Sequence, residues 1–258
     1  MKSGVFKIAY VVPCYNEESR FNISYWNLVA SNFPEILWLF VDDGSSDKTY
    51  EKLLGLSYLF NCKVLRKPLN AGKSEALRSG FNYLFAQFPE LVALGFLDCD
   101  GAVELQDISH ISMGYEDHDN ASLENWDCII ASRIKLAGRR IKRNKSRHYI
   151  GRIFVTIATF GWEEAPYDTQ CGLKLFRNSP ALQNSMKTQY RTRWFFDVEL
   201  FLRISTNREQ EVIIKEIPLN AWQDINGSKI TILEKFRVVK ELFYITRLVA
   251  KNKYLRRN

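Results

Sequence analysis

The sequence predicts an α/β fold, a Rossmann-like, doubly wound and mostly parallel sheet with helices on both faces. Its first half alternates short apolar runs with helical segments, a rhythm typical of parallel sheets. Each apolar run ends in a polar loop rich in Asp, Asn or Gly. A chain of 258 residues that is 46% hydrophobic is long and apolar enough to bury the core of such a sheet.

The elements of the first half follow from periodicity and from local stop signals. Strands are expected at residues 6–13, 36–41, 62–66 and 91–97, which are short, apolar and rich in β-formers. Helices are expected at 21–31, from a Ser46 cap to about Leu59, and at 70–87. Because ligands of such sheets bind beyond the carboxyl ends of the strands, the loops at Tyr15, Asp42 and Asp98 should converge on one site.

The second half is less regular. Strands are expected at 127–132, 172–177 and 211–217, with helices at 149–160, 195–205 and from about 231 onward. No repeat or linker divides the chain. We therefore expect one domain over 1–258, with a first half at about 1–104, a second half at about 105–235 and a basic amphipathic helix at about 231–258.

The last helix carries an apolar stripe, which is expected to pack on the core in its first half, while its basic end is available for lipid. The stripe consists of Phe236, Val239, Leu242, Phe243, Thr246 and Val249.

Charge and cysteine usage narrow the class of protein. The net charge of +7 predicts an anionic partner. Five widely spaced cysteines without a C-x-x-C pair argue against a disulfide framework or structural zinc and favour buried thiols in a reducing compartment. No apolar run approaches the ~20 residues that span a bilayer. We expect a cytoplasmic protein, soluble or peripheral at the inner face of the membrane.

Asp98-Cys99-Asp100 is the first candidate site. Two carboxylates one residue apart, directly after an apolar strand, can face one hard cation, and Mg²⁺ or Mn²⁺ prefers such oxygen ligands. A cation there would neutralise charge that grows on a diphosphate leaving group. Taken alone, the pattern also fits a turn with helix-capping aspartates.

Three further loops fit a nucleotide. Asp42 and Asp43 end the second strand, where a carboxylate can accept hydrogen bonds from a base N–H or a ribose hydroxyl. In Pro13-Cys14-Tyr15-Asn16-Glu17, Tyr15 could stack on a base and Glu17 bind a ribose. In Asn70-Ala71-Gly72-Lys73, a helix start offers free N–H groups and a cation to phosphate, although the Walker A pattern is absent. Each could also be an ordinary turn.

The order of these four motifs resembles family 2 glycosyltransferases with the GT-A fold. Three later segments, at 168–176, 193–200 and 221–229, resemble the dolichyl-phosphate glucosyltransferase branch of that family. The similarity extends from about residue 6 to 235.

The resemblance implies inverting transfer of a hexose, expected to be glucose, from a UDP-sugar, with Mg²⁺ or Mn²⁺ as cofactor. It implies that Asp98 and Asp100 face the metal, with Asp100, Asp168 and Gln170 near the reacting sugar together with Gly172. The nucleotide-sugar pocket would be lined by Pro13, Tyr15, Glu17, Asp42 and Asp43, with Gly72, Lys73 and Asp98 beside its phosphates.

The acceptor side is expected in a basic stretch. Residues 129–162 contain no acidic side chain and nine Lys or Arg. From it, Arg133, Arg139, Arg140 and Arg147 are predicted to hold a polyprenyl (dolichyl or undecaprenyl) phosphate, with peripheral contact to an anionic membrane.

Two alternatives stay open. The first is a soluble family 2 transferase that glycosylates a glycan hydroxyl of a surface polysaccharide, with Asp168 as the candidate base. The second is a non-catalytic module that binds nucleotide sugar or nucleic acid. No nucleic acid is expected as a partner.

Overall fold

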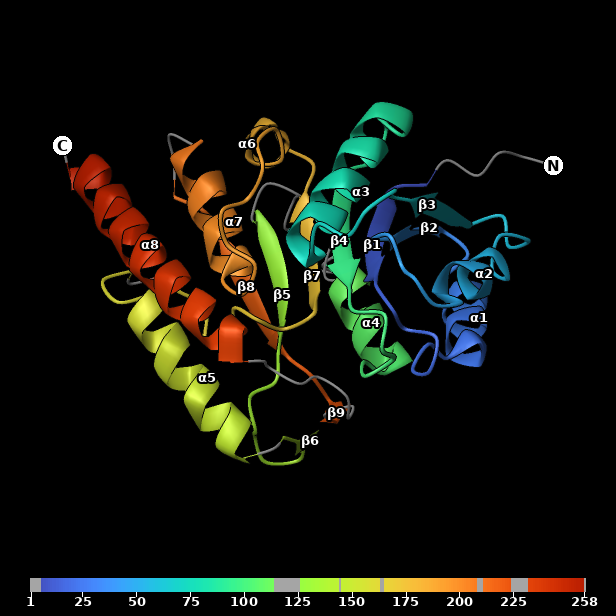
Figure 1. Cartoon of the computed structure of the whole chain (residues 1–258), viewed down its shortest axis with the longest axis horizontal. Coiled ribbons are helices and arrows are strands. Elements are labelled where there is room, and N and C mark those ends of the chain that lie inside the picture. The colour runs from blue at the N-terminus through green and yellow to red at the C-terminus, as the bar shows by residue number, and fades with distance from the viewer. Residues whose placement is uncertain are drawn as a thin grey trace.

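A computed structural model describes residues 6–113, 126–143, 145–162, 165–207, 211–223 and 232–257. Within these ranges a seven-stranded sheet has the order β3-β2-β1-β4-β7-β5-β8, and a two-stranded sheet pairs β6 with β9 (Figure 1). The pairs β1–β2, β2–β3, β1–β4 and β5–β8 are parallel, whereas β7 runs antiparallel to both of its neighbours. The expectation of a mostly parallel α/β sheet is confirmed.

The elements of the first half match the predicted rhythm. The strands are β1 Ile8–Cys14, β2 Ile36–Asp42, β3 Cys62–Arg66 and β4 Ala93–Leu97. The helices are α1 Ile23–Asn32, α2 Thr49–Leu54, α3 Lys73–Gln87 and α4 Leu105–Met113. Every residue of β2 and β4 is buried, which explains why both read as continuous apolar runs.

The second half contributes β5 Cys128–Ser132, β6 Arg140–Lys142, β7 Leu173–Arg177, β8 Ile214–Pro218 and β9 Ala221–Gln223. Its helices are α5 Lys145–Ala158, α6 Pro180–Ser185, α7 Phe196–Thr206 and α8 Ile232–Arg257. Strands β5, β7 and β8 extend the sheet begun by β1 to β4, so one sheet contains strands of both halves.

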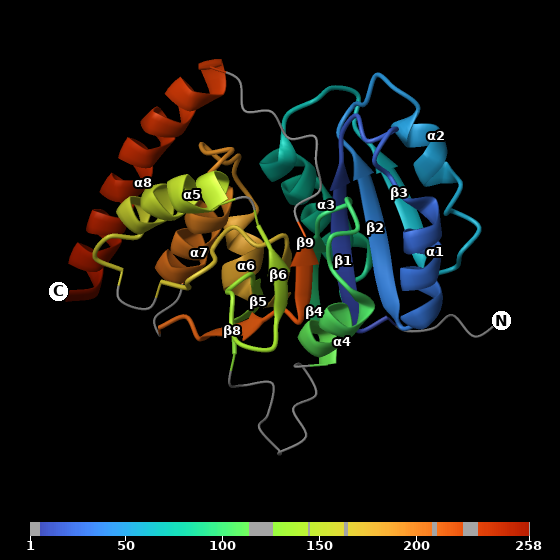
Figure 2. The ribbon, with the colours of Figure 1, turned by 90° about the horizontal axis from the view of Figure 1, so that it is seen from below.

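The core lies on both faces of the sheet (Figures 1 and 2). One face packs against α1, α2 and α4 through buried side chains such as Trp26, Leu53 and Ile108. The other face packs against α3, α6 and α7 through residues such as Phe81 and Phe201. This arrangement leaves the carboxyl ends of β1, β2 and β4 together at one edge, where the candidate site lies.

Helices α5 and α8 pack together and against α7 at the edge of the molecule opposite α1 and α2 (Figure 1). The apolar stripe predicted for the last helix is wrong at Val239 and Phe243, which are 57% and 60% exposed, and right at Leu242 and Val249, which pack on the core. The other buried positions of this helix are Val238, Glu241 and Ile245. Glu241 accepts hydrogen bonds from the N–H groups of Trp194 and Phe195, which selects this register.

Four elements were absent from the sequence reading: α4, β6, α6 and β9. The Ser46 cap is wrong as well. Helix α2 begins at Thr49, and Asp47 Oδ1 accepts both the N–H and the hydroxyl of Thr49. No helix in the described ranges is long and apolar enough to cross a bilayer.

Candidate functional site

The loops after β1 and β2 hold each other at the carboxyl edge of the sheet. The N–H of Asp43 donates to Cys14 O at 2.9 Å, and Asn16 N–H donates to Ser45 Oγ at 3.0 Å. Glu17 N–H donates to Thr49 Oγ1 at 2.7 Å. The segment 13–17 and the segment 42–49 therefore form one surface, as the strand-end rule predicted.

Asp42 sits beneath this surface and contacts Ser45 and Arg66, two residues that line a pocket. Its side chain is fully buried, and Oδ1 accepts the N–H of Ser45 at 3.2 Å. Oδ2 accepts no hydrogen bond from the described residues and lies 3.4 Å from Arg66 Nε. A buried carboxylate oxygen with unused acceptor capacity is suited to a ligand N–H or hydroxyl.

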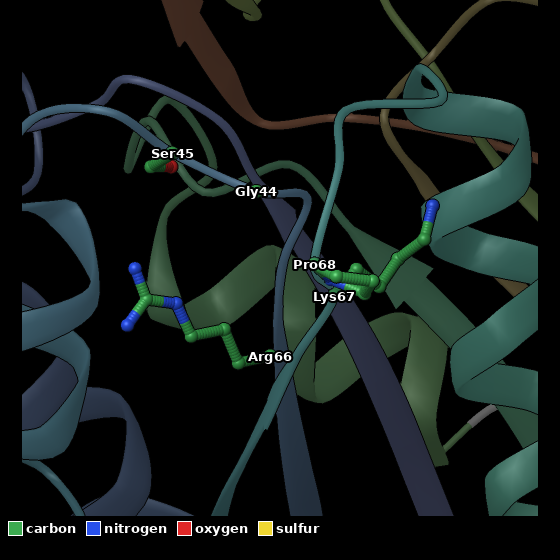
Figure 3. Close-up of a pocket in the computed structure, with 5 residues that line it drawn as sticks. All are labelled: Gly44, Ser45, Arg66, Lys67 and Pro68. Atoms are coloured by element: carbon green, nitrogen blue, oxygen red, sulfur yellow. The ribbon is translucent and has the colours of Figure 1, made fainter.

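The pocket itself measures about 350 Å³ and is lined by Gly44, Ser45, Arg66, Lys67 and Pro68. Figure 3 shows the Arg66 guanidinium on the Ser45 side and the Lys67 ammonium pointing to the opposite side. The guanidinium of Arg66 also stacks on the ring of Tyr50, 4.2 Å from its centroid. The pocket thus has a flat cation in its lining, and the same guanidinium lies beside the buried carboxylate of Asp42.

Asp43 organises the loop that precedes α3. Its carboxylate accepts the N–H groups of Ala71 and Gly72 and the ammonium of Lys67. Gly72 adopts a φ of 92°, a conformation that glycine tolerates best. All three of these partners donate to a carboxylate that is 2% exposed, so Asp43 shapes the loop from within.

Asp98 follows β4 and is held from both sides. Its Oδ1 accepts the Lys73 ammonium at 2.5 Å, and its backbone N–H donates to Gly172 O at 3.0 Å. A Cβ on Gly172 would lie 2.1 Å from Asp98 Oδ2, so only glycine leaves room for this carboxylate. Burial alone would lower the pKa of Lys73, but the charge of Asp98 and of neighbouring carboxylates raises it.

Asp100 and Glu17 form the second acidic part of the site. Burial, and then the charge of Asp98, raise the pKa of Asp100. Burial likewise raises the pKa of Glu17, partly offset by its ion pair with Arg20. Glu17 Oε2 is buried and accepts no hydrogen bond from the described residues.

This donor set fits a hard divalent cation. In the described part of the chain no group of three His, Cys, Asp or Glu side chains could hold a metal. Side chains alone would therefore leave the coordination shell of a metal incomplete. Asp98 and Asp100 could supply two oxygen ligands, with water and phosphate oxygens completing the shell as they do for Mg²⁺. Burial, and then the charge of Asp98, raise the pKa of Asp100, and a bound cation would favour its ionised form.

Asp168, a predicted catalytic residue from the second half of the chain, is engaged in an ion pair. Arg133 Nε donates to Asp168 Oδ2, and Arg133 Nη2 to Oδ1, each at 2.7 Å. The backbone N–H of Arg133 also donates to Oδ2, at 2.9 Å. Burial would raise the pKa of Asp168, but Arg133 and then Arg143 lower it to about 2. Such a carboxylate is a weak base.

The remaining predicted residues are dispersed. Gln170 donates to Trp194 O at 3.3 Å, beside the loop that carries Arg193. Arg140 is exposed and pairs with Glu104, while Arg139 is half-buried. Arg147 lies in α5, but its side chain lies outside the described part of the structure, as does most of the segment 221–229. Of the four predicted acceptor arginines, Arg133 alone reaches Asp168 in a described ion pair.

Arg193, which was not among the predicted site residues, also lies at this edge. A Cβ on Gly72 would lie 3.4 Å from Arg193 Nε, so the guanidinium covers the start of α3 beside Lys73. Arg193 is exposed and has no ion pair with the described residues. The loop that presents it is fixed by Glu199, which accepts the N–H groups of Arg191 and Thr192. The one feature of the sequence that pointed to Arg193 is its place in the segment 193–200, which resembles the glucosyltransferase branch.

Comparison with known sequences identifies the family of the chain. The family model described as Glycosyl transferase family 2 matches residues 10–191. A dolichyl-phosphate beta-glucosyltransferase of Trichomonas vaginalis is 29% identical over 92% of this chain and 69% of its own length. The enzymes of the same name from Saccharomyces cerevisiae and Homo sapiens are 27% and 29% identical, over 92% and 87% of this chain and 73% and 69% of theirs.

Solved structures share the GT-A fold. Glucosyl-3-phosphoglycerate synthase from Mycobacterium tuberculosis, in complex with Mn²⁺, UDP and phosphoglyceric acid, superposes with a TM-score of 0.61 at 16% identity. The match covers 97% of this chain and 78% of that one. TarS 1–349 of S. aureus in complex with UDP gives a TM-score of 0.60 at 18% identity, over 96% of this chain and 65% of that one.

Proposed function

The chain belongs to glycosyl transferase family 2, and from this premise we propose that it transfers glucose from UDP-glucose to a polyprenyl phosphate with inversion. The observation that carries the proposal is the cluster of Lys73, Arg193, Asp98 and Asp100 at the carboxyl edge of the sheet. Relatives named dolichyl-phosphate beta-glucosyltransferase support the choice of sugar and acceptor. The acceptor would be met at the cytoplasmic face of a membrane.

The donor would occupy the half of the chain at about 1–104. Asp42 Oδ2 is free to accept an imide N–H of a uracil base, and the Arg66 guanidinium offers a flat surface beside it. Pro13, Tyr15 and Glu17 would line the nucleoside, Glu17 Oε2 accepting a ribose hydroxyl. Asp43 acts indirectly, because it holds the N–H groups that precede α3.

The diphosphate would lie over the start of α3. Lys73, Arg193 and the first N–H groups of the helix provide positive charge where the leaving group gains negative charge. When bound by Asp98 and Asp100, Mg²⁺ or Mn²⁺ supplies further charge neutralisation for the diphosphate. The acceptor oxygen attacks the anomeric carbon, the bond from that carbon to the β-phosphate oxygen breaks, and UDP leaves from the opposite side, which gives inversion.

The acceptor would approach from the half at about 105–235. A phosphate monoester is already an anion and needs no strong general base, so positioning and charge suffice. This agrees with the Asp168–Arg133 ion pair, because Asp168 binds Arg133 and is not a free proton acceptor. Arg139, Arg140 and Arg147 remain candidates for later contacts with the acceptor phosphate.

A donor screen tests the proposal. Release of UDP or GDP is measured across nucleotide sugars with Mn²⁺ present, with and without a short-chain polyprenyl phosphate. We expect release of UDP from UDP-glucose that depends on the lipid phosphate. Transfer to a glycan hydroxyl, with no product on any lipid phosphate, would favour the soluble polysaccharide transferase instead.

A further inference from the structure

Helix α5 presents an apolar face to solvent. Tyr149, Ile153 and Ile157 are 65%, 60% and 44% exposed, and Phe160, in the turn that follows the helix, is 84% exposed. Their spacing of four, four and three residues puts them on one side of a helix. Large side chains grouped in this way usually mark an interaction surface rather than scattered surface residues.

The opposite side of the same helix accounts for its packing. Val155 and Ala158 are buried, and Phe154 is partly buried against α7 and α8. The helix therefore already has a partner for its inner face, and folding does not require the outer stripe. Ile153, Ile157 and Phe160 keep large exposed fractions, so the described part of the chain leaves these three side chains open to solvent.

Exposed positive charge lies in the segment that leads into α5, at the N-terminal end of the stripe. The β5–β6 loop and β6 lead directly into α5, and Figure 1 shows β6 next to the first turn of α5. In the sequence, residues 129–162 contain nine Lys or Arg and no acidic residue. Lys135, Arg140 and Lys142 are exposed. Basic residues at one end of a stripe of large apolar side chains complement an anionic lipid surface, into which the apolar groups insert while the cations meet headgroups.

The stripe also adjoins the acceptor side of the site. The Arg152 guanidinium stacks on the Tyr167 ring, 3.9 Å from its centroid, and donates to Tyr167 O. Tyr167 precedes Asp168, which holds Arg133. A bilayer on the outer face of α5 would therefore lie close to the loop at which a lipid phosphate is expected.

We propose that the outer face of α5, formed by Tyr149, Ile153, Ile157 and Phe160, docks the protein on an anionic membrane surface. This moves the membrane contact from the basic end of α8, where the sequence had suggested it, to α5. On α8 the exposed apolar side chains are Val239 and Phe243, and the ring of Phe243 is covered by the Arg247 guanidinium at 4.1 Å. The inference rests on the proposed function only for the reason why the protein would dock, which is to reach a lipid-linked acceptor.

The test measures co-sedimentation of the full chain with vesicles that contain no acceptor and no donor. Phosphatidylcholine vesicles with phosphatidylserine are compared with vesicles of phosphatidylcholine alone. The variant Ile153→Gln with Phe160→Gln is compared with Val239→Gln with Phe243→Gln, a matched pair of exposed apolar residues on α8. The α5 pair should weaken partitioning onto the anionic vesicles by about tenfold or more, because binding scales with the apolar area inserted. The α8 pair should bind like the unaltered protein.

Equal binding by both variants, or no binding of the unaltered protein to anionic vesicles, would overturn the proposal. So would a dimer in solution that the α5 pair dissociates, because a second copy would then cover the stripe. Turnover on a water-soluble short-chain polyprenyl phosphate separates this inference from the proposed function. If the transfer reaction is wrong, that turnover is absent while vesicle binding keeps its dependence on α5. If the docking surface is wrong, turnover persists without that dependence.

Discussion

At the scale of single residues, the site concentrates negative charge that its own cations only partly balance. Asp98 has Lys73 at 2.5 Å, whereas Asp100 has no ion pair with the described residues, and its pKa is raised by burial and by the charge of Asp98. When folding raises the pKa of a carboxyl group, the folded protein loses stability as the pH rises from the ordinary pKa through the raised one. At neutral pH, the ionised Asp100 therefore destabilises the protein when no cation is bound.

The change Asp100→Asn should raise the melting temperature of the metal-free protein at neutral pH, because it removes this unfavourable charge. The same change should abolish metal-dependent turnover. Added Mn²⁺ should then raise the melting temperature of the unaltered protein and leave that of Asp100→Asn nearly unchanged. Differential scanning fluorimetry with and without EDTA measures this. A metal-free variant less stable than the parent would contradict the assigned electrostatics.

The Asp168–Arg133 pair behaves in the opposite sense. The pKa of Asp168 is lowered to about 2, so its stabilising contribution is complete above the ordinary value of 3.8 and is lost as the pH falls between these values. Asp168→Asn should cost about 3–5 kcal/mol of unfolding free energy, because Arg133 would stay buried without its counter-charge.

Chemical denaturation at neutral pH measures that loss. The double change Asp168→Leu with Arg133→Met is the control, and it should cost less than the single change because both charges disappear. Were Asp168 instead a general base, Asp168→Asn would stop transfer to a hydroxyl acceptor while leaving stability almost intact.

At the scale of elements, β4 and β7 meet where the site needs space. They run antiparallel, with Leu97 opposite Leu173, so Gly172 lies beside Asp98 just past the end of β4. A Cβ at Gly172 would lie 2.1 Å from Asp98 Oδ2, and the carboxylate or the loop must move to admit it.

Gly172→Ala should therefore leave the fold intact and reduce turnover by about 100-fold, the effect of displacing a reacting group by about 1 Å. Gly151→Ala is the matched control, because a Cβ there meets nothing within 4 Å. In the interior of α5 that change should stabilise the protein by up to about 1 kcal/mol and leave turnover unchanged. Steady-state kinetics and thermal melts on both variants decide the outcome. Equal turnover by the two variants would show that the position of Asp98 does not depend on the space left by Gly172.

The same scale explains what the sequence could predict. Strands such as β2 are continuous apolar runs, and the carboxyl-edge rule then brought Glu17, Asp43 and Asp98 to one place without any knowledge of contacts. Strands β6 and β9 are three residues each and pair across a long sequence separation, so no periodicity reveals them. The buried register of α8 depends on Glu241 bonding to Trp194 and Phe195, a tertiary contact that overrode the apolar pattern.

The pairing of charges in the site could likewise not be predicted from the sequence. The basic stretch was visible as composition, but its members separate in the fold: Arg133 pairs with Asp168, Arg140 with Glu104, and Arg152 stacks on Tyr167. Arg193 lies 121 positions along the chain from Gly72, and the fold alone brings it to the start of α3. Pairwise side-chain geometry of this kind is set by packing rather than by local sequence.

At the scale of the whole molecule, a net charge of +7 fits several anionic ligands, and the proposed function selects one with a base and a diphosphate. A ligand that binds the folded state stabilises it by RT ln(1 + [L]/Kd), about 2.7 kcal/mol at one hundred times Kd. UDP with Mn²⁺ should therefore raise the melting temperature. UDP without metal should raise it less, and UMP, which lacks the β-phosphate, should raise it least.

A single-stranded oligonucleotide tests the binding-module alternative under the same conditions. At physiological ionic strength it should produce no shift, since counterion-driven binding weakens with salt whereas the proposed UDP site combines a buried acceptor with fixed N–H donors. Asp100→Asn should remove the extra stabilisation that Mn²⁺ adds to UDP and leave any oligonucleotide shift as it was. A shift with the oligonucleotide that exceeds the one with UDP and Mn²⁺, and that Asp100→Asn does not alter, would mean that the basic surface rather than the carboxyl edge of the sheet is the principal ligand site.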